Sequence, residues 1–326
     1  MSPQSLAAAD VAVVVATRDR PERLAALLDA LASQTIGSER FEVVVVDDAS
    51  SDAAGTAAAV DRRRDRMGIR LLHRDRPGGP AAARDDGWRA TTAPAIAFTD
   101  DDCVPAPGWL AAGLRAMTAN PAAIVQGRTE PAPWERERAG PFSRTIAVRE
   151  PDPAFQTCNV LYPRAVLERV DGFDTAAFGR SPGGEDSDLA WRAIESGTMA
   201  VFAPDALVYH AVDDLGPVGK LRVAARWTTP MLAYSRHPDL RRAHFVKGIF
   251  WKGSHYHLVR AIVGLAVPRR LRFLRPWLLG PYVLTIRARA RAERTSVLLA
   301  PYFLLHDLVE LVAVLRAAIR YRSLML

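Results

Sequence analysis

Short runs of small and β-branched apolar residues alternate with segments of helical periodicity over the front of the chain. The strand-sized runs are residues 11–16, 41–46, 69–73 and 95–99. The helical patterns between them are residues 22–33, 50–66 and 81–90. Such alternation is typical of βαβ units, so it predicts an α/β fold with a mostly parallel sheet flanked by helices.

The pattern continues less regularly to about residue 210. It predicts helices over residues 109–118, 163–170 and 186–196, and strands over residues 124–126, 158–162, 201–203 and 206–210. The proline-rich, charged stretch 130–153 is expected to be a loop. We therefore expect one α/β domain over residues 1–215, with halves at about 1–105 and 106–215.

From about residue 216 the chain becomes basic and rich in aromatic residues. Residues 216–326 hold 20 Lys and Arg against 4 Asp and Glu, whereas residues 1–215 hold 23 against 32, which gives +16 and −9. Helices are expected over residues 218–235 and 240–267. Two apolar stretches, 276–286 and 295–306, are about a dozen residues each and fall short of the ~18–20 needed to span a bilayer. The pattern predicts amphipathic, interfacial helices on an anionic surface.

Composition narrows the classes of protein. Hydrophobic residues make up 49% and charged residues 24% of the 326 residues, which excludes a disordered or collagen-like chain. The two cysteines, Cys103 and Cys158, cannot form a disulfide framework. The start of the chain has no basic segment before its apolar run, so export is not expected. No nucleic-acid recognition motif is present, so we expect the basic region to meet a membrane surface.

Three consecutive carboxylates, Asp100, Asp101 and Asp102, follow the strand predicted at 95–99. In an extended segment Asp100 and Asp102 would point to the same side, where they could hold one divalent cation. The alternative is a solvated acidic turn. Asp47 and Asp48 follow the strand at 41–46, although Asp and Ser also serve as turn formers and helix caps there. Both groups lie where open α/β sheets place their ligand crevice.

The order of the segments VVVATRDRPERL, VVVVDDASSD, GGPAAARDDGW, IAFTDDDCVP, GEDSDLAWR and VYH resembles family 2 glycosyltransferases. The resemblance covers roughly residues 11–210. It implies a GT-A-like, Rossmann-related sheet that binds a nucleoside-diphosphate sugar in its first half and an acceptor in its second. The basic, mainly α-helical region 216–326 follows that domain.

The resemblance also implies roles for individual residues. Asp100, Asp102 and His210 would bind Mn²⁺ or Mg²⁺, and a histidine ligand favours Mn²⁺. The residues implied at the nucleotide sugar are Thr17, Arg18, Asp47, Asp48, Arg84, Asp100 and Asp101. Arg84 lies in a segment that carries Asp85 where the family usually has Asn.

On the acceptor side the resemblance points to Glu185, Asn159 and Trp191. Asp186 matches the second acid of the family's "ED" motif, the general base in relatives that invert the sugar. We expect the N-terminal dipole of the helix at 186–196 to keep Asp186 ionised. A helix cap is the alternative for Asp186, a loop histidine for His210, and a buried helix face for Trp191.

These features predict a metal-dependent transfer of a sugar to an acceptor hydroxyl, with inversion and with Asp186 as base. The acceptor would be a lipid-linked saccharide or a cell-envelope glycan, with a soluble acceptor such as a secondary metabolite or a peptide as the alternative. The protein would be cytoplasmic and peripheral on the inner membrane face. A nucleotidyltransferase or NAD enzyme is disfavoured because no glycine-rich phosphate loop follows the first strand. The remaining alternative is a non-catalytic scaffold that binds a membrane or a polyanion through a degenerate nucleotide-sugar domain.

Overall fold

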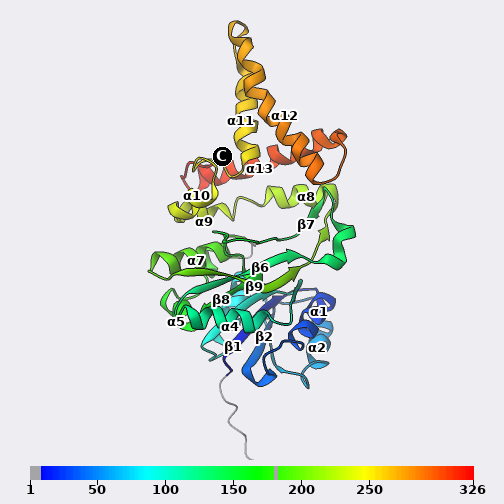
Figure 1. The fold of residues 1–326 in the computed structure, drawn as a ribbon, viewed down its shortest axis with the longest axis vertical. Coiled ribbons are helices and arrows are strands. Elements are labelled where there is room, and N and C mark those ends of the chain that lie inside the picture. Colours follow the sequence, from blue (N-terminus) through cyan, green and yellow to red (C-terminus); the bar gives the residue numbers. More distant parts are fainter. Residues whose placement is uncertain (1–8, 180–182) are drawn as a thin grey trace, which may run out of the picture. The chain divides into compact units, whose positions relative to one another are not determined.

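The computed structural model describes residues 9–179 and 183–326. Its contacts divide the chain into two units (Figure 1). The first unit comprises the chain up to Arg136 together with Thr145–Ala211, and the second comprises Glu137–Arg144 and Val212–Leu326. The second unit thus begins before residue 216 and also takes a short segment from the predicted loop at 130–153.

Within the described residues, eight strands of the first unit form one sheet in the order β3-β2-β1-β4-β8-β6-β9-β5. The strands are β1 Val11–Thr17, β2 Phe41–Asp47, β3 Gly68–His73, β4 Ala95–Asp100, β5 Cys103–Pro105, β6 Ile124–Pro131, β8 Val160–Pro163 and β9 Ala200–His210. The first four strands pair in parallel, as do β6 and β9, whereas β8 and β5 run antiparallel to their neighbours. The predicted α/β class is confirmed.

Helices cover both faces of this sheet, which explains why its central strands are almost continuously apolar. One face packs against α1 (Pro21–Leu31), α2 (Ala53–Asp61) and α4 (Trp109–Ala119). The other face packs against α3 (Pro80–Arg89), α5 (Arg164–Arg169) and α7 (Glu185–Glu195). The shorter elements are η1 Ser38–Arg40, η2 Pro133–Arg138, η3 Thr157–Asn159 and α6 Thr175–Phe178.

The register of the parallel strands brings their polar ends together. Thr17 of β1 pairs with Asp47 of β2, and Asp47 in turn pairs with His73 of β3. On the other side of β1, Ala16 pairs with Asp100 of β4. The carboxyl ends of four strands therefore form one polar edge, as the sequence predicted.

Several predicted elements differ from the structure at their boundaries. The helix expected at 50–66 is limited to Ala53–Asp61: the Asp52 side chain caps its start by accepting a hydrogen bond from the Gly55 amide at 2.8 Å, and the residues after Asp61 form turns. The strands expected at 201–203 and 206–210 form the single strand β9, and a register shift in β6 between Gly127 and Arg128 accommodates it. The strand expected at 158–162 begins as η3 and continues as β8.

The second unit is mainly helical. Its elements are β7 Ser143–Arg144, β10 Asp213–Asp214, α8 Gly216–Ala225, α9 Met231–Arg236, α10 Pro238–His244, α11 Gly253–Ala266, η4 Arg269–Leu274, α12 Arg275–Ala292, η5 Val297–Leu299 and α13 Ala300–Arg320. The long helices predicted at 218–235 and 240–267 are each divided. The second is interrupted where Lys247 and Gly248 both adopt positive φ angles.

One segment of the described chain, Val297–Arg320, is long and apolar enough to cross a membrane by length and composition. Its mean hydropathy is 1.8, and 39% of its most apolar window is buried. The prediction that both apolar stretches end after about a dozen residues is wrong for this one, because α13 continues through Asp307 and Glu310. Both carboxylates are buried and have partners, so they do not end the helix.

Close packing of α3 on β1 and β2 gives a test of the fold. A methyl group on Gly87 would approach Val14 Cγ1 to 2.5 Å and Val46 Cγ2 to 3.1 Å. We expect Gly87→Ala to lower the free energy of unfolding by roughly 1–3 kcal/mol through overpacking, measured by denaturant unfolding. Gly68→Ala is the matched control, because nothing lies within 4 Å of the added methyl group. Equal stabilities of the two variants would contradict this packing.

Candidate active site

The guanidinium of Arg84 joins α3 to both β4 and α7. Its Nη2 donates to Asp100 Oδ1 at 2.6 Å, and its Nη1 donates to Glu185 Oε1 at 3.0 Å. Arg84 is only 6% exposed. Burial opposes the charge on Arg84, but Asp100 and Glu185 outweigh it and raise its pKa. The two acidic motifs of the sequence thus meet on one buried cation.

Asp186 lies beside this bridge in the first turn of α7. The turn before the helix depends on Gly184, whose φ of 91° is costly for other residues. Asp186 is partly exposed, and its Oδ1 accepts a hydrogen bond from the Ser187 amide at 2.8 Å.

The dipole of α7 does not dominate the ionisation of Asp186. Burial and the neighbouring carboxylate of Glu185 raise its pKa to about 7, although the Ser187 amide and Arg84 oppose this rise. The expectation that the helix keeps this group ionised well below neutral pH is therefore corrected. A carboxylate poised near neutrality is suited to proton transfer.

Asp101 and Asp102 lie in a turn between β4 and β5. The alternation expected for an extended strand therefore does not apply, and Asp100 is directed to Arg84 instead. Arg20 Nη1 donates to Asp101 Oδ1 at 3.2 Å and to Asp102 Oδ2 at 3.0 Å. Thr17 Oγ1 donates to Asp101 Oδ2 at 2.8 Å. Burial raises the pKa of Asp101 to about 6 against the effect of Arg20.

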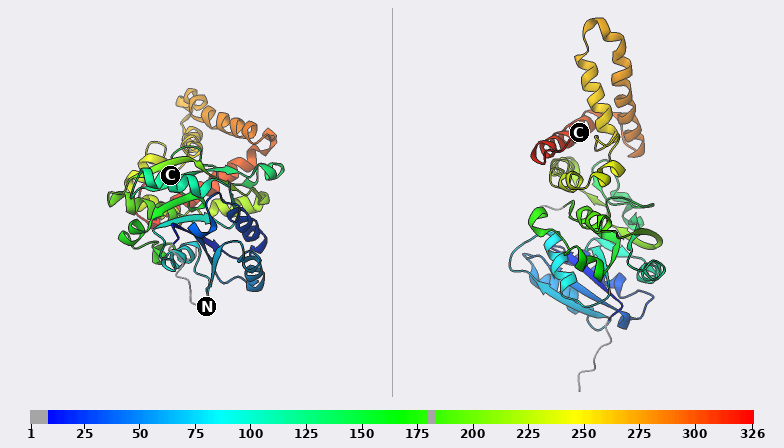
Figure 2. Two further views of the ribbon diagram at one scale, coloured as in Figure 1. Left: turned by 60° about the horizontal axis from the view of Figure 1, so that its bottom comes forward. Right: turned by 90° about the vertical axis from the view of Figure 1, so that its left-hand side faces the viewer.

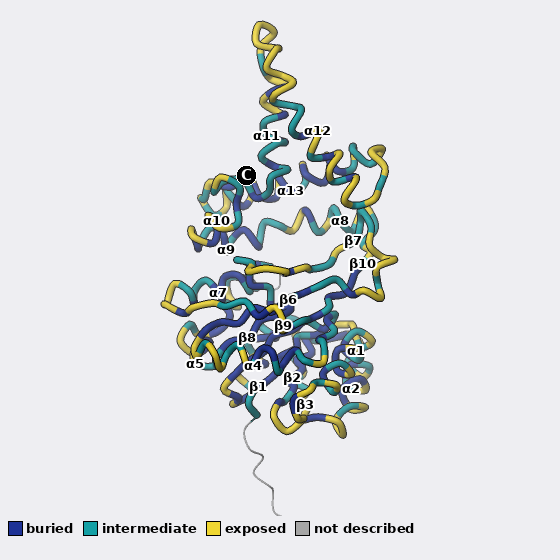
Figure 3. The backbone as a smooth tube through the Cα atoms, viewed as in Figure 1, coloured by how far each residue is buried: buried dark blue, intermediate teal, exposed yellow. Residues whose placement is uncertain are grey.

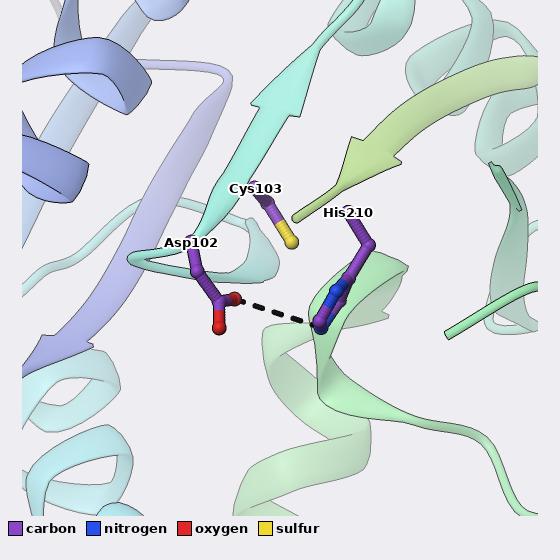
Figure 4. A group of neighbouring side chains, drawn as sticks. All are labelled: Asp102, Cys103 and His210. Atoms are coloured by element: carbon purple, nitrogen blue, oxygen red, sulfur yellow. Dashed lines mark ion pairs between the residues drawn. The ribbon is translucent and has the colours of Figure 1, made fainter. Parts of the chain in front are cut away.

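Asp102, Cys103 and His210 form a group whose ligand atoms lie within 4.8 Å of one another (Figure 4). His210 Nε2 lies 3.6 Å from Asp102 Oδ1, and that oxygen is buried with no hydrogen-bond partner among the described residues. This separation is too long for a hydrogen bond and close to the roughly 3–3.5 Å between two ligands of one ion.

The tautomer of His210 also suits a metal ligand. Its Nδ1 lies 2.9 Å from the carbonyl oxygen of Ala211, which can only accept, so Nδ1 donates and Nε2 is the nitrogen that a neutral imidazole would offer to a metal beside Asp102. Burial raises the pKa of the Cys103 thiol well above its usual value, so Cys103 is a weak ligand as a neutral thiol. Asp102 and His210 are the residues here that fit a divalent cation.

Asp47 and Asp48 are buried and already engaged. Asp48 accepts hydrogen bonds from the amides of Gly78 and Gly79 at 2.7 and 2.8 Å, so it shapes the loop that leads into α3. Asp47 Oδ1 accepts from the Ser50 amide at 3.0 Å, and Asp47 Oδ2 lies 3.1 Å from His73 Nδ1. Both carboxylates stand at the polar edge, but they also hold its loops in place.

Three predicted site residues contact neither the Arg84 bridge nor the group of Asp102, Cys103 and His210. Arg18 is half-exposed and pairs with Asp19 at 3.4 Å. Asn159 is buried, where it accepts from Trp109 Nε1 at 2.8 Å and donates to two backbone carbonyls. Trp191 is partly buried and donates to the Pro153 carbonyl at 2.8 Å. The contacts of Asn159 are those of a residue that ties the sheet together.

Three residues at the polar edge are not among the predicted site residues: Arg20, His73 and Arg74. Arg20 follows the first strand in the TRDRPER segment, and His73 ends the predicted third strand, so their positions carried a signal. Arg74 Nε lies 3.0 Å from Asp48 Oδ1. What the sequence could not supply was which of several nearby arginines reaches which carboxylate.

Comparison with known proteins gives the family. The family model described as glycosyl transferase family 2 matches residues 12–175, which is half of the chain. The chain belongs to this family. The Pre-mycofactocin glycosyltransferase of Mycobacterium tuberculosis is 32% identical over 213 residues, and the Validoxylamine A glucosyltransferase of Streptomyces hygroscopicus subsp. limoneus is 28% identical over 298. These matches cover 62% and 81% of this chain, but only 42% and 62% of the two relatives.

Solved structures show the same fold. The mannosyltransferase PcManGT from Pyrobaculum calidifontis, solved with GDP-Man and Mn²⁺, aligns with a TM-score of 0.61 at 23% identity. The alignment covers 97% of this chain and 90% of that one. TarS of S. aureus in complex with UDP-GlcNAc aligns with a TM-score of 0.55 at 16% identity, covering 96% of this chain and 92% of that one. At these identities the likeness establishes a GT-A-like fold.

The raised pKa of Asp186 gives a test of the site's electrostatics. Because its folded-state pKa lies above the unfolded value, ionisation of Asp186 destabilises the fold as the pH rises through about 4 to 7. We expect Asp186→Asn to stabilise the protein by about 1–4 kcal/mol at about pH 8.5 and to change little at about pH 4.5. Thermal unfolding at both pH values measures this.

The control is Asp205→Asn, at an exposed position of β9. We expect its effect on stability to be small and similar at both pH values. Destabilisation by Asp186→Asn at alkaline pH would contradict the account of the site.

Proposed function

We propose that this protein transfers a sugar from a nucleoside-diphosphate sugar to an acceptor hydroxyl. The observation that carries the proposal is the bridge of Arg84, which places the carboxylate-rich end of β4 beside the first turn of α7. A donor held at the strand ends would therefore lie within reach of Asp186. Membership of glycosyl transferase family 2 and the GT-A-like fold support the same activity.

Asp102 and His210 are the proposed ligands of a divalent cation. The unpartnered Asp102 Oδ1 and the orientation of His210 support this role, and the Mn²⁺ in the similar mannosyltransferase is consistent with it. When bound, such a cation would neutralise charge on the departing diphosphate as a Lewis acid. Asp100 was predicted as the other ligand, but its Oδ1 is bonded to Arg84, so we assign Asp100 mainly to that bridge.

The donor would lie along the polar edge formed by β1, β2 and β4. Asp47, Asp48 and Thr17 line that edge and hold its loops, while Arg20 supplies positive charge beside Asp101 and Asp102. A guanidinium at this place would pair with phosphate oxygens when carboxylates engage a cation. We propose that Arg20, rather than Arg18 or the buried Arg84, is the arginine at the diphosphate.

Asp186 is the proposed general base. It is the partly exposed acid of the pair, whereas Glu185 is buried and holds Arg84. With a pKa of about 7, a substantial fraction of the carboxylate is ionised near neutral pH. The carboxylate is also basic enough to take the proton of an acceptor hydroxyl. Direct attack by that hydroxyl, with Asp186 taking its proton, would invert the configuration at the anomeric carbon.

The acceptor and the location of the reaction are further parts of the proposal. The similar proteins are named Pre-mycofactocin glycosyltransferase and Validoxylamine A glucosyltransferase, and the two names refer to different compounds, so we do not take the acceptor from the relatives. The basic second unit favours an acceptor presented at a membrane surface, such as a lipid-linked saccharide or an envelope glycan. A cytoplasmic protein on the inner membrane face fits this view.

Binding of nucleoside diphosphates tests the proposal. We expect one of UDP, GDP and dTDP to raise the midpoint of thermal unfolding in the presence of Mn²⁺ but not in its absence. Saturation at about 100 times Kd adds ~2.7 kcal/mol to the free energy of unfolding. We expect Asp102→Ala to lose this stabilisation, and His210→Ala to weaken it.

Asp65→Ala, at an exposed position in the turn that precedes β3, is the control and should respond as the wild type does. Circular dichroism establishes that each variant is folded. If no nucleotide stabilises folded wild-type protein, the scaffold alternative replaces the enzyme. If Asp102→Ala responds to metal and nucleotide as the wild type does, the metal assignment is wrong.

A further inference from the structure

The second unit carries nearly all the exposed large apolar side chains of the described chain. Of 21 such residues, 19 lie in this unit, and Trp134 and Met199 are the two outside it. A soluble protein scatters such residues singly, whereas a concentration of them marks a surface that contacts something else. Figure 3 shows exposed backbone along the outer half of the hairpin formed by α11 and α12.

Helix α13 differs from the usual amphipathic helix of a soluble protein, because it exposes large apolar residues as well as burying them. Its buried side includes three ionisable residues, His306, Asp307 and Glu310, while large apolar residues occupy its exposed side. Those exposed residues are Leu304, Leu305, Leu308, Val312, Leu315 and Ile319. Polar residues paired inside and apolar residues outside are the arrangement expected of helices that meet lipid.

The polar interior of the unit is internally compensated. Lys252 Nζ donates to both oxygens of Glu310 at 2.7 and 2.8 Å, and Tyr282 donates to Asp307 at 3.1 Å. Although burial opposes it, His255 and Lys252 lower the pKa of Glu310 to about 2. Arg289 Nη1 also donates to Asp307 Oδ1 at 3.3 Å. The acids of this interior are therefore satisfied within the unit by Lys252, Tyr282 and Arg289, and these partners do not include the arginines at residues 269–275.

The hairpin extends away from α13 (Figure 2). Its inner half packs on Phe303 and Leu311 of α13, but between residues 262 and 281 only Gly264 is buried. Gly264 lets the two helices approach closely, since a methyl group there would lie 2.8 Å from Leu278 Cβ. The outer half is thus a defined pair of helices that leaves most of its side chains exposed.

The end of the hairpin combines exposed apolar groups with positive charge. We call this end the tip; its residues are Arg269, Arg270, Leu271, Arg272, Phe273, Leu274, Arg275 and Trp277. Phe273 is 66% and Trp277 77% exposed. Residues 253–292 contain eight arginines and no aspartate or glutamate. Arg260 and Arg275 donate to backbone carbonyls of the opposite helix at 2.9 and 3.1 Å, which holds the tip together.

We propose that the tip of the α11–α12 hairpin inserts into the surface of an anionic lipid bilayer. Leu271, Phe273, Leu274 and Trp277 would enter the acyl boundary, and the arginines between them would contact lipid phosphates. At the surface of an anionic bilayer, lipid phosphates and acyl chains lie within a few ångströms of each other in depth. Along η4, arginines and apolar residues are interspersed, which matches that environment. In a symmetric dimer the tip of one copy would face the same arginine-rich, acid-free tip of the other. Repulsion between these like charges would oppose such a dimer.

This inference specifies the membrane contact of the proposed function but can be tested without it. We would measure binding of the full chain to vesicles by flotation, using phosphatidylcholine alone and phosphatidylcholine with phosphatidylglycerol. We expect binding to the anionic vesicles that weakens with added salt. Binding to neutral and anionic vesicles alike, or to neither, would overturn the proposal.

Two sets of variants separate the apolar and ionic parts. We expect Phe273→Ser with Trp277→Ser to weaken binding by at least ~10-fold. We expect Arg269→Gln, Arg270→Gln and Arg272→Gln together to weaken it by about 100-fold, or roughly fivefold for each arginine. Met199→Ser is the matched control, because Met199 is also 66% exposed but lies in the first unit. Equal binding of all variants would overturn the proposal.

A conservative variant measures the depth of insertion. Lipids with brominated acyl chains should quench tryptophan fluorescence in the wild type and quench it less in Trp277→Phe, which keeps an apolar ring. Unchanged quenching would contradict insertion of the tip. Lipid-free sedimentation is the other control: a dimer that Phe273→Ser and Trp277→Ser dissociate would assign the tip to a second copy of the chain instead.

Donor binding, measured on the same variants without vesicles, keeps the two proposals apart. Loss of vesicle binding with intact nucleotide binding concerns the tip alone. Absence of nucleotide binding with intact vesicle binding would overturn the proposed function and leave the tip's role standing.

Discussion

The buried charge of Arg84 is the interaction on which the arrangement of the site depends. A guanidinium that is nine-tenths buried is stable only when carboxylates surround it, and here they come from two distant segments, Asp100 on β4 and Glu185 on α7. Removing either partner would leave an uncompensated charge in the interior, typically a loss of about 3–5 kcal/mol. The bridge therefore fixes the position of Asp186, which shares the first turn of α7 with Glu185. It also explains why these two adjacent acids have different environments, one buried and engaged, the other partly exposed with a raised pKa.

Much of the fold could be predicted from the sequence because its strands are buried on both faces. Continuous Val-rich runs such as β1 and β2 are recognisable without tertiary information, and parallel strands bring their carboxyl ends to one edge. The site was less predictable, because its details depend on side-chain partners. Asp102 and His210 come together because β5 pairs with β9. In this pairing Cys103 lies opposite His210, although the two residues are 107 positions apart in the sequence. The turn at Asp101 and Asp102 removes the strand alternation on which the expected pairing of Asp100 with Asp102 rested.

The second unit was least predictable, because the sequence does not show which charged residues are buried and which apolar residues are exposed. In the sequence Asp307 ends the apolar stretch 295–306. In the structure Lys252 and Tyr282 satisfy Glu310 and Asp307 inside the unit, so α13 continues to Arg320. Composition predicted an amphipathic basic region and could not show that the apolar side faces outward. Two physical demands thus shape the described part of the chain: buried charges such as Arg84 and Glu310 are paired, and apolar surface beyond what the chain itself buries is left for a partner.

The most direct test of the account is to separate donor binding from catalysis at Asp186. Release of nucleoside diphosphate from the sugar nucleotide that stabilises the protein would be measured in wild type and in Asp186→Asn, together with the affinity for that donor. The account predicts unchanged, Mn²⁺-dependent donor affinity in the variant and a rate of release lower by about 100- to 10,000-fold, because only proton transfer is lost. A variant that turns over at the wild-type rate would contradict the assignment of Asp186 as base, and with it the proposed function of the bridge that positions it.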